Sequence, residues 1–161
     1  MTLLASAPAW LAIVLALLLL AAALEDMWRL EITNILSGGV AIAAFVAVAI
    51  DGPMIGLWQN LLLFAAVLAV GTMLFARGVM GGGDIKLLAA SALWFDLSQG
   101  WKMLVAAALA GGLVTIATMM LRLLPWPDAV RKHLALVRRR ESIPYAVAIA
   151  AGVATIGWWA R

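Results

Sequence analysis

The chain has 161 residues, of which 66% are hydrophobic and only 12% are charged. Soluble globular domains use about half apolar and about a quarter charged residues, so this composition excludes an ordinary soluble domain and indicates an integral membrane protein. The chain contains no cysteine, which excludes disulfides, thiolate metal sites and thiol nucleophiles. The length fits one compact bundle, because a helix needs roughly 20 residues to cross a bilayer. We therefore expect a single membrane-embedded, all-α domain over residues 1–161.

Apolar stretches of about the length of a membrane span recur along the whole chain. We predict a bundle of six spanning helices, separated by short polar or glycine-containing segments. Their expected ranges are about 3–24, 35–50, 55–76, 85–97, 103–121 and 143–160. The first has no basic residue before it, so we interpret it as a span and not as a secretory signal. The fourth is short for a full crossing, and a re-entrant segment is its alternative.

Basic residues are distributed unevenly between the two sides of this six-span arrangement. One side carries only Lys102 and Arg161. Because Lys and Arg concentrate in cytoplasmic loops, the other side is predicted to face the cytoplasm, with both termini outside. That side carries nine basic residues: Arg29, Arg77, Lys86, Arg122, Arg131, Lys132, Arg138, Arg139 and Arg140.

The segment of residues 122–142, between the fifth and sixth spans, is the most basic part of the chain. Within it Val130, Leu134 and Val137 recur at helical spacing among Arg and Lys residues. This pattern fits a basic amphipathic helix lying on an anionic membrane surface. A solvated loop whose charges only fix the topology is the alternative.

Tryptophans provide a second indication of where the spans end. Because Trp is enriched at membrane–water interfaces, we expect those near outer span ends to lie at headgroup level. They are Trp58, Trp94, Trp101, Trp158 and Trp159.

Two acidic residues stand at predicted cytoplasmic ends of spans. Asp26 follows the first span, and Asp84 opens the fourth directly after a glycine run. An acid at the edge of hydrocarbon is costly to keep ionised and costly to bury unpaired, so it marks a functional site. Two carboxylates that meet in a low-dielectric pocket share a proton and titrate as a pair. One can then activate a water while the other donates to a carbonyl, which is acid–base peptide hydrolysis without a covalent intermediate.

The glycines before Asp84 have two possible roles. Gly81 and Gly83 would allow positive φ and a close approach of a substrate backbone to the acid. Alternatively, the glycine run only breaks a helix and Asp84 caps the next one.

Other classes of protein would also place acids in a membrane. In a small proton-coupled transporter Asp26 and Asp84 would mark an ion path, and in a structural subunit they would be caps. Against the transporter, both acids stand at span ends and not near the midplane, and no inverted repeat is evident.

The segment GGGDIKLLAA at residues 81–90 resembles the glycine-any-glycine-aspartate motif of the type IV prepilin peptidases, a motif shared with presenilin-type intramembrane aspartyl proteases. Asp26 with Ile32 and Asn34 resembles the first motif of that family, in which an isoleucine-proline-asparagine follows the aspartate. The chain departs from that motif at Thr33, which occupies the proline position.

The last span begins with IPYA at residues 143–146, which resembles the last-helix signature of the same family, although glycine more usually follows the tyrosine. The resemblance implies an aspartyl endopeptidase of the bacterial inner membrane with Asp26 and Asp84 as its catalytic pair. It implies a prepilin or pseudopilin substrate, whose basic leader is cut on the cytoplasmic side and whose apolar helix lies against the bundle. The small size resembles the peptidases of tight-adherence (Flp-type) pili, and an archaellin or other class III signal peptidase is a related alternative.

Two polar residues near the acids receive weaker predictions. Lys86 could favour the charged form of Asp84 or meet an acidic group of the substrate, but it could also snorkel to the headgroups. Asn34 could hydrogen-bond near Asp26. We expect no metal and no cofactor, since the single histidine, His133, stands among basic residues. A topology signal explains the basic loop, so we expect no nucleic-acid partner; the bilayer and the prepilin are the expected partners.

Overall fold

The protein is all-helical in a computed structural model that describes residues 2–52, 56–125 and 143–159. No strand occurs in those ranges, so the all-α prediction is confirmed. Most of the predicted basic segment, residues 126–142, lies outside the described residues. The helices are α1 (Leu3–Ser6), α2 (Ala9–Arg29), α3 (Asn34–Asp51), α4 (Leu57–Ala76), α5 (Gly82–Ala92), α6 (Leu97–Leu123) and α8 (Tyr145–Trp159).

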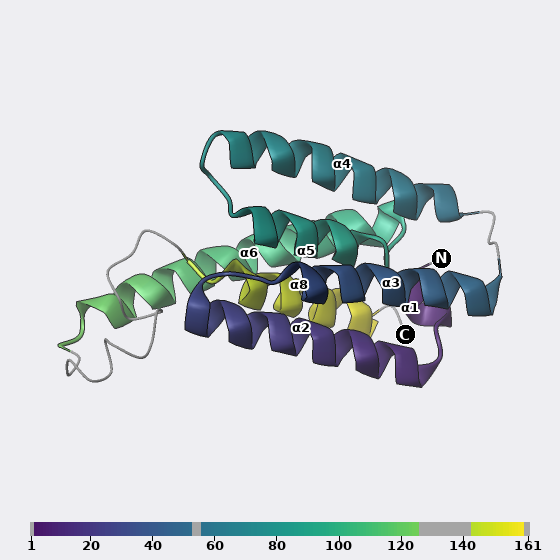
Figure 1. The fold of residues 1–161 in the computed structure, drawn as a ribbon, viewed down its shortest axis with the longest axis horizontal. Coiled ribbons are helices and arrows are strands. Elements are labelled where there is room, and N and C mark those ends of the chain that lie inside the picture. The colour runs from purple at the N-terminus through teal and green to yellow at the C-terminus, as the bar shows by residue number, and fades with distance from the viewer. Residues whose placement is uncertain (1, 53–55, 126–142, 160–161) are drawn as a thin grey trace.

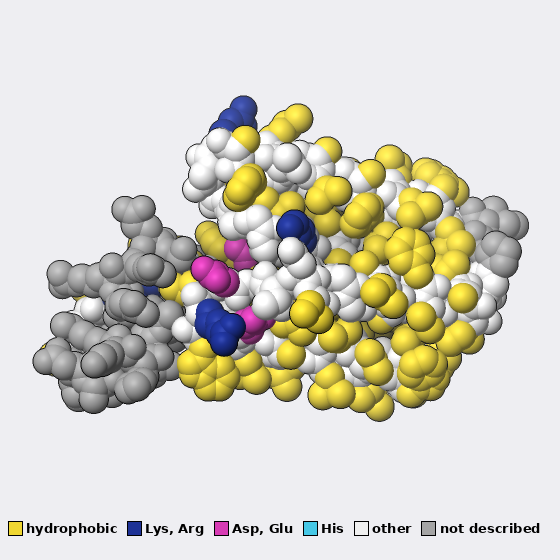
Figure 2. Space-filling model, viewed as in Figure 1, with side chains coloured by type: hydrophobic (Ala, Val, Ile, Leu, Met, Phe, Trp, Pro, Cys, Tyr) yellow, Lys and Arg dark blue, Asp and Glu magenta, His cyan; other side chains and the backbone are white. Residues whose placement is uncertain are grey.

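Within the described residues four helices, α2, α3, α4 and α6, are long and apolar enough to cross a membrane, with mean hydropathies between 1.8 and 2.2. Large apolar side chains remain exposed along them, for example Ile42 and Leu109. In Figure 2 hydrophobic side chains cover most of the visible face, and charged side chains gather toward one end. An apolar exterior of this kind is what a bundle surrounded by lipid needs.

The helices form a bundle in which the chain runs back and forth (Figure 1). α2 packs against α3 and α8, α5 lies against α3 and α4, and α6 packs mainly on α8. Figure 1 shows α2 and α4 ending at the end of the bundle where α3, α5 and α8 begin, with both chain termini at the opposite end. We call the first of these the active-site end, because the two acids of interest lie there.

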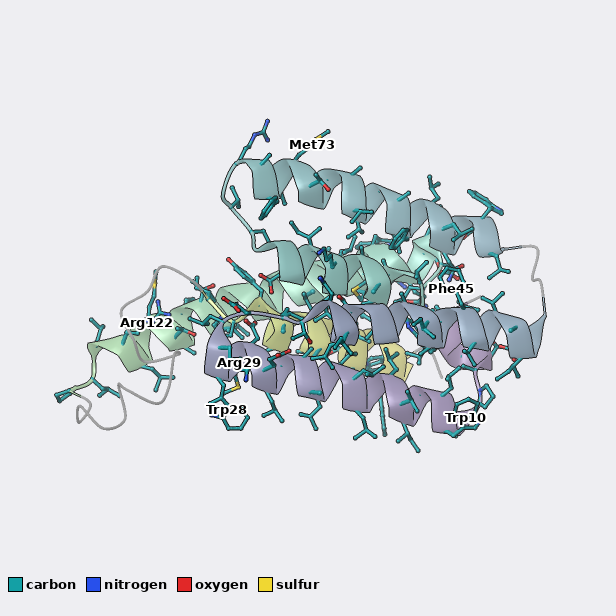
Figure 3. All side chains as sticks on the ribbon, in the orientation of Figure 1. Trp10, Trp28, Arg29, Phe45, Met73 and Arg122 are labelled. Carbon is teal, nitrogen blue, oxygen red and sulfur yellow. The ribbon has the colours of Figure 1, made fainter. Side chains whose placement is uncertain are left out.

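The first predicted span, residues 3–24, is wrong in its bounds. Pro8, with φ −53° and ψ 146°, separates α1 from α2, because proline lacks the N–H that a continuing helix needs. At the other end α2 continues through the polar residues to Arg29 and stops at Leu30, whose left-handed φ of 56° ends the helix. Trp10 and Trp28 lie at opposite ends of α2 (Figure 3), as expected of aromatic residues at the two membrane interfaces.

The fourth predicted span, residues 85–97, is a short helix followed by a turn. The 11 residues of α5 are about 16 Å long, roughly half of a hydrocarbon core. The segment nevertheless runs along α4, since Gly82 lies next to Phe75 and the Asn60 side chain donates to the Leu93 carbonyl at 2.9 Å. Chain direction therefore reverses here as the six-span arrangement requires, partly through a turn that is buried in protein.

That turn also corrects two expectations. Asp96 accepts from the Gln99 N–H at 2.9 Å and caps α6, which therefore begins at Leu97 and not near residue 103. Trp94 is fully buried and donates to the Val40 carbonyl at 3.2 Å, so its predicted headgroup position is wrong. Trp58, Trp101, Trp158 and Trp159 are exposed, as expected.

Close backbone contact holds α8 in place. A Cβ atom at Gly152 would lie 2.7 Å from the Ala107 backbone nitrogen and 2.9 Å from its Cα, so α8 presses directly on α6. Small residues at helix contacts permit such approach in lipid.

Replacing Gly152 with alanine should force α6 and α8 apart, which we expect to destabilise the bundle by about 1–3 kcal/mol. Thermal unfolding in detergent measures this as a lower Tm. The matched control is Gly112→Ala on α6, where an added Cβ meets nothing within 4 Å and alanine favours the helix. Equal Tm values for the two variants would contradict the packing described here.

Candidate active site

Asp26 lies in the last turn of α2, on the face that the helix buries. That face carries Leu11, Leu15, Leu19 and Ala22 at helical spacing, and Asp26 continues it by one more turn. The side chain is only 3% exposed. The apolar stripe that anchors α2 in the bundle therefore delivers a carboxylate to its active-site end.

The buried carboxylate of Asp26 is satisfied by the beginning of α8. Its Oδ2 atom accepts a hydrogen bond of 2.9 Å from the backbone N–H of Ala146. The first N–H groups of a helix have no partner within the helix, and they favour negative charge. Residues 143–146, the motif at the start of the last span, thus join the C-terminal part of the chain to Asp26.

Asp84 is the third residue of α5, and Gly81 is the N-cap of that helix. The Asp84 side chain is 8% exposed, and its Oδ1 atom has no hydrogen-bond partner within the described part of the chain. Asp84 is therefore not the N-cap that the structural alternative required. It keeps one carboxylate oxygen free at a largely buried position.

The two motif glycines provide space and not unusual backbone angles. A Cβ at Gly81 would lie 2.7 Å from Oδ2 of Asp84, so a side chain there would displace the carboxylate. A Cβ at Gly83 would lie 3.1 Å from Cβ of Ile32 and 3.2 Å from its carbonyl oxygen. In the described residues positive φ at glycine occurs only at Gly52 and Gly78, so this run does not use the positive φ that its glycines would allow.

The connection of residues 30–33, between α2 and α3, contributes Leu30, Glu31 and Ile32 to the lining of the site that holds both acids. The Leu30 N–H donates to the Asp26 carbonyl at 2.8 Å and ends α2. At its other end Thr33 donates from both its N–H and its hydroxyl to Oε2 of Glu25, at 3.2 and 3.1 Å. The residue in the proline position of the motif is therefore anchored by two hydrogen bonds to α2.

Both aspartates line one cavity of about 320 Å³ at the active-site end. Sequence reasoning identified the acids and the glycines, left the role of Glu31 open and missed Leu30, for which only its place between Asp26 and Ile32 gave a signal. The described lining residues are Asp26, Leu30, Glu31, Ile32, Gly81, Gly82, Gly83 and Asp84. The structure thus brings together the two carboxylates that the sequence analysis paired.

Lys86 and Asn34 are brought to each other. Nζ of Lys86 donates to Oδ1 of Asn34 at 2.9 Å, in an exposed contact that joins α5 to the first residue of α3. Neither residue lines the cavity. The contact fixes the start of α3 beside α5, outside the cavity that holds the acids.

A cavity lined by two buried carboxylates can perform general acid–base chemistry on a polar substrate. Two such groups close together cannot both ionise cheaply, so a shared proton is favoured. Glycine backbone on one wall leaves room for an extended chain to approach.

Comparison with known families indicates a peptidase. The model of the type IV leader peptidase family matches residues 13–116, well over half of the chain, and this range includes Asp26 and Asp84. Searches of curated proteins and of solved structures give no match. The match covers more than half of the chain, and the helical bundle is of the kind that spans a membrane. The chain therefore belongs to the type IV leader peptidase family.

Proposed function

We propose that this membrane peptidase is an aspartic endopeptidase that removes the leader of Flp-like type IV prepilins or pseudopilins, with Asp26 and Asp84 as its catalytic pair. The observation that carries the proposal is that these two carboxylates, far apart in the sequence, line one cavity. The two carboxylates and a water suffice for acid–base hydrolysis. The glycines at 81 and 83 support the pair by leaving it room.

The environments of the two acids suggest how the roles divide. The Ala146 N–H stabilises negative charge on Asp26, so Asp26 acts as the base that takes a proton from the attacking water. Asp84 carries the shared proton on its unpartnered Oδ1 and donates it to the carbonyl oxygen of the scissile bond. When the tetrahedral intermediate collapses, Asp26 gives its proton to the leaving amine and the C–N bond breaks. A hydroxyl of the intermediate returns a proton to Asp84 as the new carbonyl forms, so the pair again holds one proton.

The charges of the described helices support a cytoplasmic location for the active-site end. Arg29 ends α2, Arg77 caps α4 and Arg122 lies in the last turn of α6, all at helix ends on that side. Lys102 lies near the start of α6, toward the other side. By the positive-inside tendency the acids would face the cytoplasm of a bacterial inner membrane and the termini the periplasm.

An apolar groove supports the proposed partner, a substrate whose hydrophobic helix lies in the bilayer. The groove has a volume of about 230 Å³ and runs between α4, α5 and α6. Met80 and Ile85 line it, and their sequence neighbours Gly81 and Asp84 line the cavity of the acids. A substrate helix that packs along this groove would have one end close to the two acids.

Replacing Asp26 or Asp84 singly with asparagine should abolish cleavage of a co-expressed Flp-type prepilin, with a fall of at least about a hundredfold. Asparagine keeps the size and hydrogen bonding of the acid but cannot exchange a proton. Leader removal is followed as a gel shift. Asp51→Asn, at the far end of α3, is the matched control and should still cut.

Full cleavage by either active-site variant would remove that residue from the catalytic pair. If the wild type cuts no prepilin or pseudopilin of several tested, the peptidase proposal fails for this substrate class and proton-coupled transport becomes the next hypothesis.

Replacing Gly81 with alanine should also suppress cleavage, by roughly a hundredfold, because the new Cβ would push the Asp84 carboxylate out of position. Gly38→Ala is the control, since it lies in the first turns of α3 and an added Cβ meets nothing within 4 Å. Initial rates on the same prepilin measure both. Equal rates for the two variants would contradict the role assigned to Gly81.

A further inference from the structure

The 30–33 connection lies directly beside the start of α5, the helix that carries Asp84. Leu30, Glu31 and Ile32 all line the cavity between the acids. Gly83 packs against the backbone of Ile32, since a Cβ there would lie 3.2 Å from the Ile32 oxygen and 3.4 Å from its nitrogen. A shift of the connection would therefore move the start of α5 and the carboxylate that it carries.

The first residue of the connection, Leu30, has an unfavourable backbone conformation. Leu30 has a φ of 56°, a left-handed angle that a residue with a side chain adopts at a cost. The bond from the Leu30 N–H to the Asp26 carbonyl holds this angle at the near end of the connection. A restraint at the far end would fix the position of the whole segment.

Glu25 supplies this restraint from α2 itself. Its Oε2 accepts both donors of Thr33, and its Oε1 lies 3.9 Å from the Arg29 guanidinium one turn further along the helix. Glu25 precedes Asp26 directly, so the helix that carries one acid also holds the wall of the cavity. The Glu25 side chain is mostly shielded, at 19% exposure, whereas Arg29 is largely exposed.

A proline at position 33 would restrain the connection in a different way. The observed φ of Thr33, −68°, is the angle that a proline ring fixes, but proline has no N–H to donate. Threonine keeps the same backbone angle and adds two donors. The Glu25–Thr33 contact and a proline at position 33 are thus two ways to restrain the backbone at the end of the connection.

We propose that Glu25 is a positioning residue, whose hydrogen bonds to Thr33 hold the 30–33 connection and thereby set the separation of Asp26 and Asp84. Glu25 does not touch the reacting atoms in this scheme. It acts through Ile32 and Gly83 on the placement of α5. The inference rests on the proposed peptidase function for its kinetic consequence, but its structural consequence can be measured without any substrate.

The kinetic test uses the purified full-length protein and a prepilin peptide. Glu25→Ala should lower kcat between about tenfold and a hundredfold with little change in KM, because the acids are misplaced and not the substrate. Glu25→Gln, which retains an oxygen that accepts both bonds, should recover most of the rate. The double variant Glu25→Ala/Thr33→Pro should recover it as well, because the ring restores the restraint without Glu25.

The structural test uses the absence of cysteine from the chain. Nitroxide labels at Glu31→Cys, on the connection, and Val79→Cys, on the exposed segment before α5, report the spacing of these two segments. Glu25→Ala should broaden the distance distribution, and adding Thr33→Pro should narrow it again.

The outcomes separate the two proposals. The positioning role is wrong if Glu25→Ala leaves both the cleavage rate and the distance distribution unchanged. It is also wrong if adding Thr33→Pro to Glu25→Ala restores neither the rate nor the narrow distribution. If no prepilin peptide is cut even by the wild type but the distances change as expected, the positioning role stands and the peptidase proposal fails.

Discussion

The hydrogen bond from the Ala146 N–H to the Asp26 carboxylate is the interaction on which the rest of the site depends. A buried carboxylate needs a partner, and the partner here comes from a backbone group at the start of the last helix. To bring that group into place, α8 must pack tightly along α6, which the Gly152–Ala107 contact permits. The last helix thus contributes to the chemistry without contributing a reactive side chain.

The position of Asp84 also depends on the space that two glycines leave beside it. Gly81 leaves room for its carboxylate, and Gly83 lets the wall of the cavity lie against α5. Both acids continue the buried face of their own helix, so the packing that holds the helices also aims the carboxylates. Fold and site are therefore consequences of the same contacts, and residues outside the acid pair, such as Glu25, can influence the reaction through geometry alone.

Much of this arrangement could be predicted from the sequence, because apolar periodicity indicates helices and an acid at a span end has few structural explanations. The left-handed backbone angle at Leu30 could not be predicted, because leucine has no preference for that conformation. The burial of Trp94 depends on a carbonyl at Val40, on another helix, and no local pattern reveals it. The motif at residues 143–146 predicts the start of the last helix, but it does not indicate that the Ala146 backbone N–H is the group that bonds Asp26, because every residue except proline has such a group.

The most direct test of the account is whether residues 26 and 84 face each other in the membrane. The protein has no cysteine, so Asp26→Cys/Asp84→Cys can be treated in native membranes with the shortest bifunctional thiol reagents and analysed by intact mass. The account predicts rapid internal cross-linking of this pair and none of the control pair Asp26→Cys/Asp51→Cys, because α3 separates residue 51 from the active-site end by about 27 Å. Equal, slow reaction of both pairs would show that the two acids do not share a cavity, and the proposed catalytic pair would then be wrong.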